Sequence, residues 1–343
     1  MTAPVHTREF EDAIRITPLS SHTYSADLST QWSVGSAPNG GYIAAILHRL
    51  STTHFKNTHP ARHSAQPMPI SMQLSFIRRS AVGPAYLTVR DIKLGARTST
   101  IQVTMSQANP PASPTSPDKL DGSNIKVAGY ITISDPVSEA GVTTPCSWKV
   151  HPPPPDSKPP QLSSAQDAQP IANSPWKKTI MKHAEFRRAS ANTELWEPVD
   201  PRLDERRAIS DQWSRLRPLG QKGGLGRWTN ESVAYLVDIF PVALGNLEDL
   251  TVKDMGVDPP YWFPTIALNI DFKKPLLSGG LEWLYSRITT KAIRNGRTDI
   301  EVVVLDEQGE VVALATQLGL IIPSTRNTGG KQKAANQPKN ANL

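Results

Sequence analysis

Two stretches of the chain carry the same alternation of hydrophobic and polar positions. Apolar side chains occupy every second position from Ile70 to Phe76, and they do so again from Ile266 to Phe272. Phe272 follows Phe76 by 196 positions (272 − 76). Strict alternation over this length is typical of a β-strand with one buried face. The pattern therefore indicates a duplicated unit in which equivalent strands recur.

The repeat continues beyond this strand. Gly83 and Gly279 mark equivalent turns, and Arg97 and Arg297 open equivalent later strands. Each unit also contains one apolar segment with helical spacing, predicted as a helix over 42–50 in the first unit and over 229–238 in the second. The predicted strands span 70–78, 86–94, 98–106 and 125–133, and then 264–273, 281–291, 299–306 and 310–321.

One apolar helix followed by several long strands, present twice, predicts an α+β fold. A helix that is apolar on several sides needs cover on more than one face, and a curled antiparallel sheet provides it. Two such sheets joined edge to edge would also protect their exposed edges. The expected architecture is a double hotdog, with two tandem hotdog units that each wrap a helix in a curled sheet.

Composition sets the expected domain boundaries. Residues 1–134 form the first unit, and 135–175 hold ten of the 31 prolines, which favours an extended or disordered linker. Residues 176–323 form the second unit, in which a charged segment, 181–217, is expected to lead into the helix. A basic tail, 324–343, is predicted to be disordered.

Charge and hydropathy exclude several classes of protein. Four of the six excess positive charges lie in the basic tail, so no basic face for nucleic acid is expected on the folded body. No run approaches the roughly 20 apolar residues that span a bilayer. The first ten residues lack an apolar leader, and the single cysteine, Cys146, cannot form an internal disulfide. A cytoplasmic protein is the expectation.

Familiar catalytic and metal motifs are missing from the sequence. There is no Gly-x-Ser-x-Gly elbow, and the glycines of 220–226 lack a preceding strand, so we interpret them as a flexible turn. Cys146 lies in the proline-rich segment beside no base. Four histidines lie close together in the first unit, but without a neighbouring cysteine or carboxylate cluster we expect exposed loop residues and no metal site. They are His48, His54, His59 and His63.

Three polar residues interrupt apolar runs in the second unit. They are Asp238, Thr265 and Gln317. A buried carboxylate is costly unless it is paired or hydrogen-bonded. Asp238 therefore either caps the backbone that is broken at Pro241 or belongs to a functional site, and the sequence leaves both interpretations open.

Four segments together match the motifs of one known protein family. The segment 235–244 resembles the family's helix, and 265–275 resembles the strand that begins Thr-Ile and ends Phe-x-Arg-Pro. The segment 309–319 is similar to the ending Gly-x-Leu-Val-Ala-x-x-x-Gln-x-Gly, and 39–45 resembles the Asn-Gly-Gly-Tyr start of the first hotdog helix. On these four segments the chain resembles acyl-CoA thioesterases of the double-hotdog type II group. Apart from the linker, the resemblance covers about residues 30–322.

The resemblance implies a thioester hydrolase without a metal or other cofactor. In that family an Asp, a Thr and a Gln hold and activate a water, and the matching positions are Asp238, Thr265 and Gln317. Asp238 would act as general base or water-orienting group. The implied substrate is an acyl-CoA or a carrier-bound acyl or polyketide thioester, and the implied state is a homo-oligomer.

The start of the first helix is the expected oxyanion and substrate-binding element. It consists of Asn39, Gly40 and Gly41, and glycine permits a close approach of substrate to backbone N–H groups. Phe76 and Phe272 are expected either to line an acyl channel between the units or to pack in the core.

Two alternatives to hydrolysis remain open. One is a cyclase or product-release factor in secondary metabolism. The long linker and the insertion at 110–121 are features of fungal thioesterase-like proteins, and they fit this alternative as well. The other is a non-catalytic acyl-binding protein with the same fold.

Overall fold

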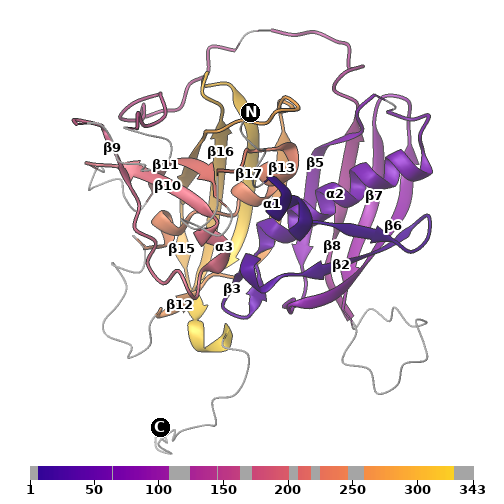
Figure 1. Ribbon diagram of the computed structural model, residues 1–343, viewed down its shortest axis with the longest axis horizontal. Helices are drawn as coiled ribbons and strands as arrows, with labels where there is room; N and C mark the ends of the chain where they lie inside the picture. Colours follow the sequence, from indigo (N-terminus) through magenta and orange to yellow (C-terminus); the bar gives the residue numbers. More distant parts are fainter. Residues whose placement is uncertain are drawn as a thin grey trace, which may run out of the picture.

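The structure, a computed structural model, describes residues 7–63, 65–107, 124–144, 146–162, 172–200, 208–217, 225–245 and 259–327. A 14-stranded antiparallel sheet runs through both halves of the chain (Figure 1). The first unit contributes six strands, which follow the order β1-β2-β6-β7-β8-β5 across the sheet. They are β1 (Ile16–Pro18), β2 (Thr23–Leu28), β5 (Met68–Phe76), β6 (Gly83–Leu94), β7 (Ser99–Ser106) and β8 (Ile125–Ser134).

The second unit continues the same sheet from β13 to β9. Along the sheet the order is β13 (Thr265–Phe272), β17 (Val311–Leu320), β16 (Arg297–Leu305), β14 (Leu284–Thr289), β11 (Ile209–Leu216), β10 (Thr193–Pro198) and β9 (Trp176–Lys178), with β15 (Ile293–Arg294) beside β16. Two small ribbons pair β3 (Ser33–Val34) with β4 (Ala37–Pro38), and β12 (Tyr261–Trp262) with β18 (Ile322–Pro323).

The two units meet where β5 pairs with β13. Gln73 lies opposite Asn269 in this ladder, and these two residues are also equivalent positions of the sequence repeat. A local twofold axis therefore passes between them. The expected edge-to-edge junction of two hotdog sheets is confirmed.

Each unit wraps a helix, and the two helices contact each other. The first is α2 (Gly40–Thr58), capped by the Asn39 side chain, which accepts the N–H of Tyr42. The second is α4 (Asn230–Leu236), which begins with a capping box between Thr229 and Ser232. Buried residues of both helices and both sheet halves form one continuous hydrophobic core. The smaller helical segments are α1 (Thr7–Ala13), α3 (Arg188–Ala191), and the 3₁₀ turns Thr30–Trp32 and Ser324–Asn327.

Helix α2 corrects the expectation for the histidines. It extends to Thr58 rather than ending near residue 50, so His48 and His54 lie inside it, 1% and 0% exposed. His63 is buried as well, and His59 follows as the C-cap. The expectation of exposed loop histidines is therefore wrong. Helix α2 holds His48 and His54 among its buried residues, and His63 is buried beyond the helix, where its Nε2 atom lies 3.0 Å from Ser99 Oγ.

The charged segment before α4 contains strands that the sequence pattern did not predict. Strands β10 and β11 pair with each other there, and Glu194 of β10 forms a buried ion pair with Arg215 of β11. Lys178 of β9 approaches the same carboxylate at 2.9 Å. Charged residues on a buried face hide the alternation that marks a strand, and mutual pairing makes their burial tolerable.

Part of the segment expected to be a linker lies against the second unit. Val150 and Leu162 pack beside a cluster of four tryptophans, Trp176, Trp196, Trp213 and Trp283. The carbonyl oxygen of Pro152 accepts a hydrogen bond from Arg287 at 2.6 Å. The insertion at 110–121, most of the glycine-rich turn and most of the basic tail fall outside the described residues. Among the described residues, no helix is both long enough and apolar enough to cross a bilayer.

Candidate functional site

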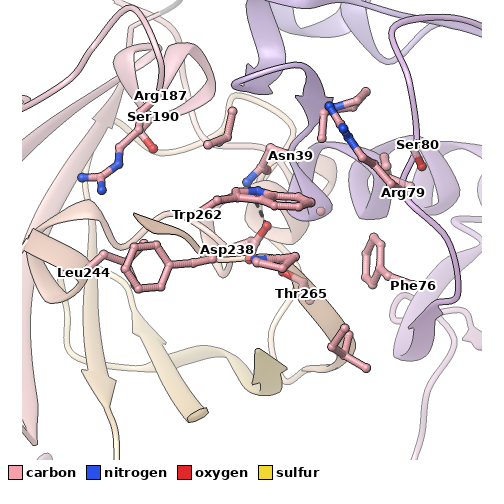
Figure 2. A pocket seen from close by; sticks show the side chains of 18 of the residues that line it. Asn39, Phe76, Arg79, Ser80, Arg187, Ser190, Asp238, Leu244, Trp262 and Thr265 are labelled. Atoms are coloured by element: carbon pink, nitrogen blue, oxygen red, sulfur yellow. Dashed lines mark hydrogen bonds between the residues drawn. The ribbon is translucent and has the colours of Figure 1, made fainter. Parts of the chain in front are cut away.

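A cavity of about 220 Å³ lies between the two units. Its wall includes Asn39, Gly40 and Phe76 from the first unit. Asp238 and Thr265 contribute from the second unit (Figure 2). The cavity therefore requires both copies of the repeat.

The Asp238 carboxylate accepts four hydrogen bonds. Asn39 Nδ2 and the Gly41 N–H donate to Oδ2, both at 2.8 Å. Gln317 Nε2 and Thr265 Oγ1 donate to Oδ1, at 2.9 and 3.2 Å. Since an ionised carboxylate offers about four lone-pair sites, these donors fill its accepting capacity. None of them comes from the backbone around Pro241, so the contacts do not match the local-cap interpretation.

Local structure explains how these groups meet. Asp238 follows directly after the C-cap of α4, Val237, and α4 packs against the beginning of α2. Thr265 is the first residue of β13, where a bulge shifts the register before Ala267. Gln317 lies on the neighbouring strand β17 and also donates to the Thr265 hydroxyl. The three residues that the sequence singled out are therefore brought into contact.

Burial and hydrogen bonding act in opposite directions on Asp238. Burial raises the pKa of Asp238 above its ordinary value, while the donors from Gly41, Gln317, Thr265 and Asn39 oppose that rise. The net direction is upward. A carboxylate with a raised pKa is a stronger base than an ordinary aspartate, which suits the removal of a proton from water.

Gln317 has one unsatisfied group. Its Oε1 atom is buried and has no hydrogen-bond partner among the described residues. A buried acceptor without a donor costs free energy, so such atoms mark places where a further polar partner fits. A water or a substrate group beside Gln317 would satisfy it.

The two glycines at the start of α2 have different surroundings. A Cβ added at Gly40 would lie 3.0 Å from Asp238 Oδ2 and 3.3 Å from Thr265 Oγ1, so Gly40 borders the polar cluster directly. A Cβ at Gly41 would lie 2.5 Å from the carbonyl oxygen of Tyr235, so Gly41 permits the close contact between the two helices. The N–H of Gly41, expected as an oxyanion donor, donates to Asp238 instead.

Apolar residues form another part of the cavity wall. Phe76 lies in the wall, together with Phe240, Leu244 and Phe263. Phe272 does not line the cavity; it packs in the core against the ring of His48, with ring centroids 5.3 Å apart. Of the two phenylalanines considered for an acyl channel, only Phe76 borders the cavity.

Arginines around the cavity were not predicted from the sequence. Figure 2 shows Arg79 on one side of Asp238 and Arg187 on the other. The Arg79 guanidinium lies 5.7 Å from the centre of the Trp262 ring and also contacts Ser36. The adjacent arginines at 78 and 79, directly after the first alternating strand, were the available signal.

Comparison with known proteins agrees with this fold and identifies the family. The family descriptions that match are "Acyl-CoA thioesterase N-terminal domain", over residues 28–116, and "Acyl-CoA thioesterase C-terminal domain", over residues 153–321. The chain belongs to the acyl-CoA thioesterase family. The resemblance inferred from the sequence is confirmed.

Individual relatives of this acyl-CoA thioesterase family member cover nearly the whole chain. The thioesterase-like protein TwmA of Talaromyces wortmannii is 29% identical over 94% of this chain and 94% of its own length. A thioesterase II candidate from Thermobifida fusca YX superposes with a TM-score of 0.63 at 18% identity, covering 94% of this chain and 99% of that one. A hot dog protein of unknown function from Alicyclobacillus acidocaldarius gives 0.60 at 18% identity, covering 92% and 98%. The solved structures establish the shared fold.

Proposed function

We propose that this protein hydrolyses an acyl-CoA or carrier-bound acyl thioester by direct attack of a water. The observation that carries the proposal is the buried Asp238 carboxylate in the wall of the interunit cavity, in contact with Thr265 and Gln317. A base within hydrogen-bond reach of a positioned water supports hydrolysis without a covalent intermediate or a metal.

The attacking water takes the place of one of the four donors. The bond from Thr265 to Asp238 Oδ1 is the longest of them at 3.2 Å, and Thr265 lines the cavity. When the Thr265 hydroxyl turns toward the water, Oδ1 is free to accept a water proton, and Gln317 Nε2 continues to hold the carboxylate. Gln317 Oε1, unpartnered among the described residues, provides a further acceptor nearby.

The chemical step then balances without another group. The water oxygen bonds to the thioester carbonyl carbon while its proton passes to Asp238, and the carbonyl oxygen becomes an oxyanion. The C–S bond breaks as the carbonyl re-forms, and the departing thiolate takes the proton from Asp238. A free carboxylic acid and a free thiol are the products.

The N–H of Gly40 is our candidate for the oxyanion donor. The first amides of a helix have no partner within the helix. Among those of α2, Gly41 donates to Asp238 and Tyr42 to Asn39 Oδ1. Gly40 precedes them and lines the cavity. The N-terminal end of a 19-residue helix also favours negative charge.

The Asp238→Asn variant tests this proposal. Thiol release from short, medium and long acyl-CoAs is expected to fall by about 10²- to 10⁴-fold, the range in which general acid–base catalysis contributes. Asp271→Asn is the matched control, since Asp271 is an exposed carboxylate on β13. Hydrolysis by Asp238→Asn at the wild-type rate would rule the mechanism out.

A non-catalytic acyl-binding protein is the second candidate. The four donors that fill the accepting capacity of Asp238 favour it, because a carboxylate held in this way resembles a structural link between the units. Equilibrium binding separates the two candidates. Wild-type protein that binds acyl-CoA tightly and never releases thiol would favour the binding protein over the hydrolase.

A further inference from the structure

Three imidazoles and one carboxylate converge at the C-terminal end of α2. The Nε2 atoms of His22 and His59 lie 3.2 and 2.8 Å from Asp91 Oδ2, and the Nε2 atom of His54 lies 3.0 Å from Asp91 Oδ1. We call these four residues the histidine cluster. They come from the loop before β2, the end of α2 and strand β6.

We propose that the histidine cluster binds one structural zinc ion. One ligating atom from each of His22, His54 and Asp91 lies within 4.8 Å of the other two. Ligands of a tetrahedral zinc ion, with bonds of about 2.0–2.1 Å, lie roughly 3.3 Å apart. The nitrogen-to-oxygen distances in the cluster, 2.8–3.2 Å, are already close to that spacing. His59 is outside the group that lies within 4.8 Å, but its Nε2 atom lies 2.8 Å from Asp91 Oδ2, and we assign it as the fourth ligand of a closed site on that contact.

The outer nitrogens of the rings support this assignment. His22 Nδ1 lies 2.8 Å from Ser21 Oγ, and His54 Nδ1 lies 3.2 Å from the carbonyl oxygen of Ser21. When each Nδ1 carries the hydrogen and donates it to Ser21, each Nε2 presents a lone pair toward Asp91. Histidine ligands of metals are usually oriented by such an oxygen acceptor on the other ring nitrogen. Ser21 provides one for both rings.

The backbone also favours a cation here. A bulge between Asp91 and Lys93 breaks the register of β6 with β7, and bulges commonly redirect side chains at sites. His54 lies in the last turns of α2 and His59 is its C-cap. The C-terminal end of a helix carries partial negative charge, which adds to the attraction of the Asp91 carboxylate for a positive ion.

The donor set selects the kind of metal. Imidazole nitrogens suit zinc, copper and nickel, whereas calcium and magnesium prefer oxygen ligands. Four protein ligands without an open position are typical of structural zinc. The His22 side chain is 40% exposed, so the ion has access from solvent, while His54 is fully buried.

The proposed ion would stabilise the fold rather than take part in hydrolysis. His54 follows Gly41 by 13 positions on α2, which places the cluster about 20 Å along the helix from the Asp238 site. Zinc there would join the loop before β2 and strand β6 to the C-terminal end of α2, the helix whose N-terminal end carries Gly41. This inference is independent of the proposed thioester chemistry.

Zinc titration of the full chain, freed of any polyhistidine tag and stripped with a chelator, tests the proposal. Calorimetry is expected to show one zinc ion per chain, and zinc is expected to raise Tm. His22→Ala and His59→Ala are each expected to weaken zinc binding by at least about tenfold. Loss of a residue that only hydrogen-bonds to a metal ligand already costs about tenfold in metal affinity or more, so loss of a ligand should cost no less. His151→Ala removes an exposed histidine outside the cluster and is expected to change nothing.

Cobalt provides a measurement that needs no variant. One equivalent of Co²⁺ added to the stripped wild-type chain is expected to give the intense visible absorption of four-coordinate cobalt, and zinc is expected to abolish it. Absence of one-to-one zinc binding would overturn the proposal. Zinc binding that persists unchanged in His22→Ala and His59→Ala would overturn it as well, since the ion would then lie elsewhere.

Discussion

The Asp238 carboxylate of the second unit accepts the backbone N–H of Gly41, in the first turn of the first unit's helix α2, at 2.8 Å. This bond joins the two copies of the repeat at the site itself. The positive end of the α2 dipole faces the carboxylate, which offsets part of the cost of burying it. The site therefore depends on how closely α2 and α4 approach each other.

Substitution of Gly41 by alanine tests that approach. The added Cβ would meet the Tyr235 carbonyl oxygen at 2.5 Å and Asp238 Cβ at 2.7 Å, and the two helices would have to separate. We expect a loss of about 1–3 kcal/mol in the free energy of unfolding, the usual cost of overpacking. Urea unfolding measures it. Gly279→Ala is the control, since a Cβ there meets no atom within 4 Å, and an equal loss in both variants would contradict this account.

Substitution of Gly40 by alanine is expected to act on catalysis rather than on folding. Its Cβ would approach Asp238 Oδ2, Thr265 Oγ1 and Phe76 Cζ at 3.0–3.3 Å, inside the cavity, without meeting helix α4. We expect a fall of about 10²-fold in kcat/KM, the effect of a small misplacement of reacting groups, with Tm nearly unchanged. Thiol-release kinetics and a melting curve measure the two quantities. A large fall in Tm with normal kcat/KM per folded molecule would contradict it.

The Thr265 hydroxyl is expected to be essential in a way that its methyl group is not. Thr265→Val keeps the shape but removes the group that donates to Asp238 and accepts from Gln317. We expect kcat to fall by about 10²-fold in Thr265→Val, because the water loses its orientation, and to stay near wild type in Thr265→Ser. Equal kcat values for the two variants would exclude the assigned role.

The raised pKa of Asp238 predicts the pH profile. Hydrolysis requires the ionised carboxylate, so kcat/KM is expected to fall as the pH drops through the pKa of Asp238 in the free enzyme. Because burial raises that pKa, this acid limb should lie above 3.8, the ordinary value for aspartate. Measurement of kcat/KM against pH checks the prediction, and an acid limb at or below 3.8 contradicts it.

The same shift predicts how stability changes with pH. The folded state binds the Asp238 proton more tightly than the unfolded state does. The stabilisation that this tighter proton binding contributes is therefore fully present below the pKa of Asp238 in the unfolded state. It is lost as the pH rises through the pKa of Asp238 in the folded state. The free energy of unfolding of wild type relative to Asp238→Asn should accordingly decrease over that interval. Urea unfolding of both proteins at several pH values measures the difference, and a relative stability that rises with pH would be inconsistent with a raised pKa.

The fold was predictable where burial follows a simple period. Alternation identified β5 and β13, which carry the junction between the units, because each strand has one buried face. Strands β10 and β11 were missed, since Glu194 and Arg215 are buried there as an ion pair. Their stability depends on partners that the local sequence does not reveal.

The site was predictable only in part for a similar reason. Asp238, Thr265 and Gln317 stand out as polar interruptions of apolar runs, and the structure brings them together. The bond from Gly41 and the histidine cluster depend on residues far apart in sequence. Asp91, for example, lies 37 positions from His54, and only the pairing of β6 with the rest of the sheet brings it near the end of α2.

Oxygen labelling tests the central claim most directly. Single-turnover hydrolysis of an acyl-CoA in H₂¹⁸O is expected to place one ¹⁸O in the released carboxylic acid with wild-type protein and with Asp271→Asn. Asp238→Asn is expected to release almost no acid over the same time. Release of an unlabelled cyclic product by the wild type, or labelled acid formed by Asp238→Asn at the wild-type rate, would contradict attack by a water that Asp238 activates.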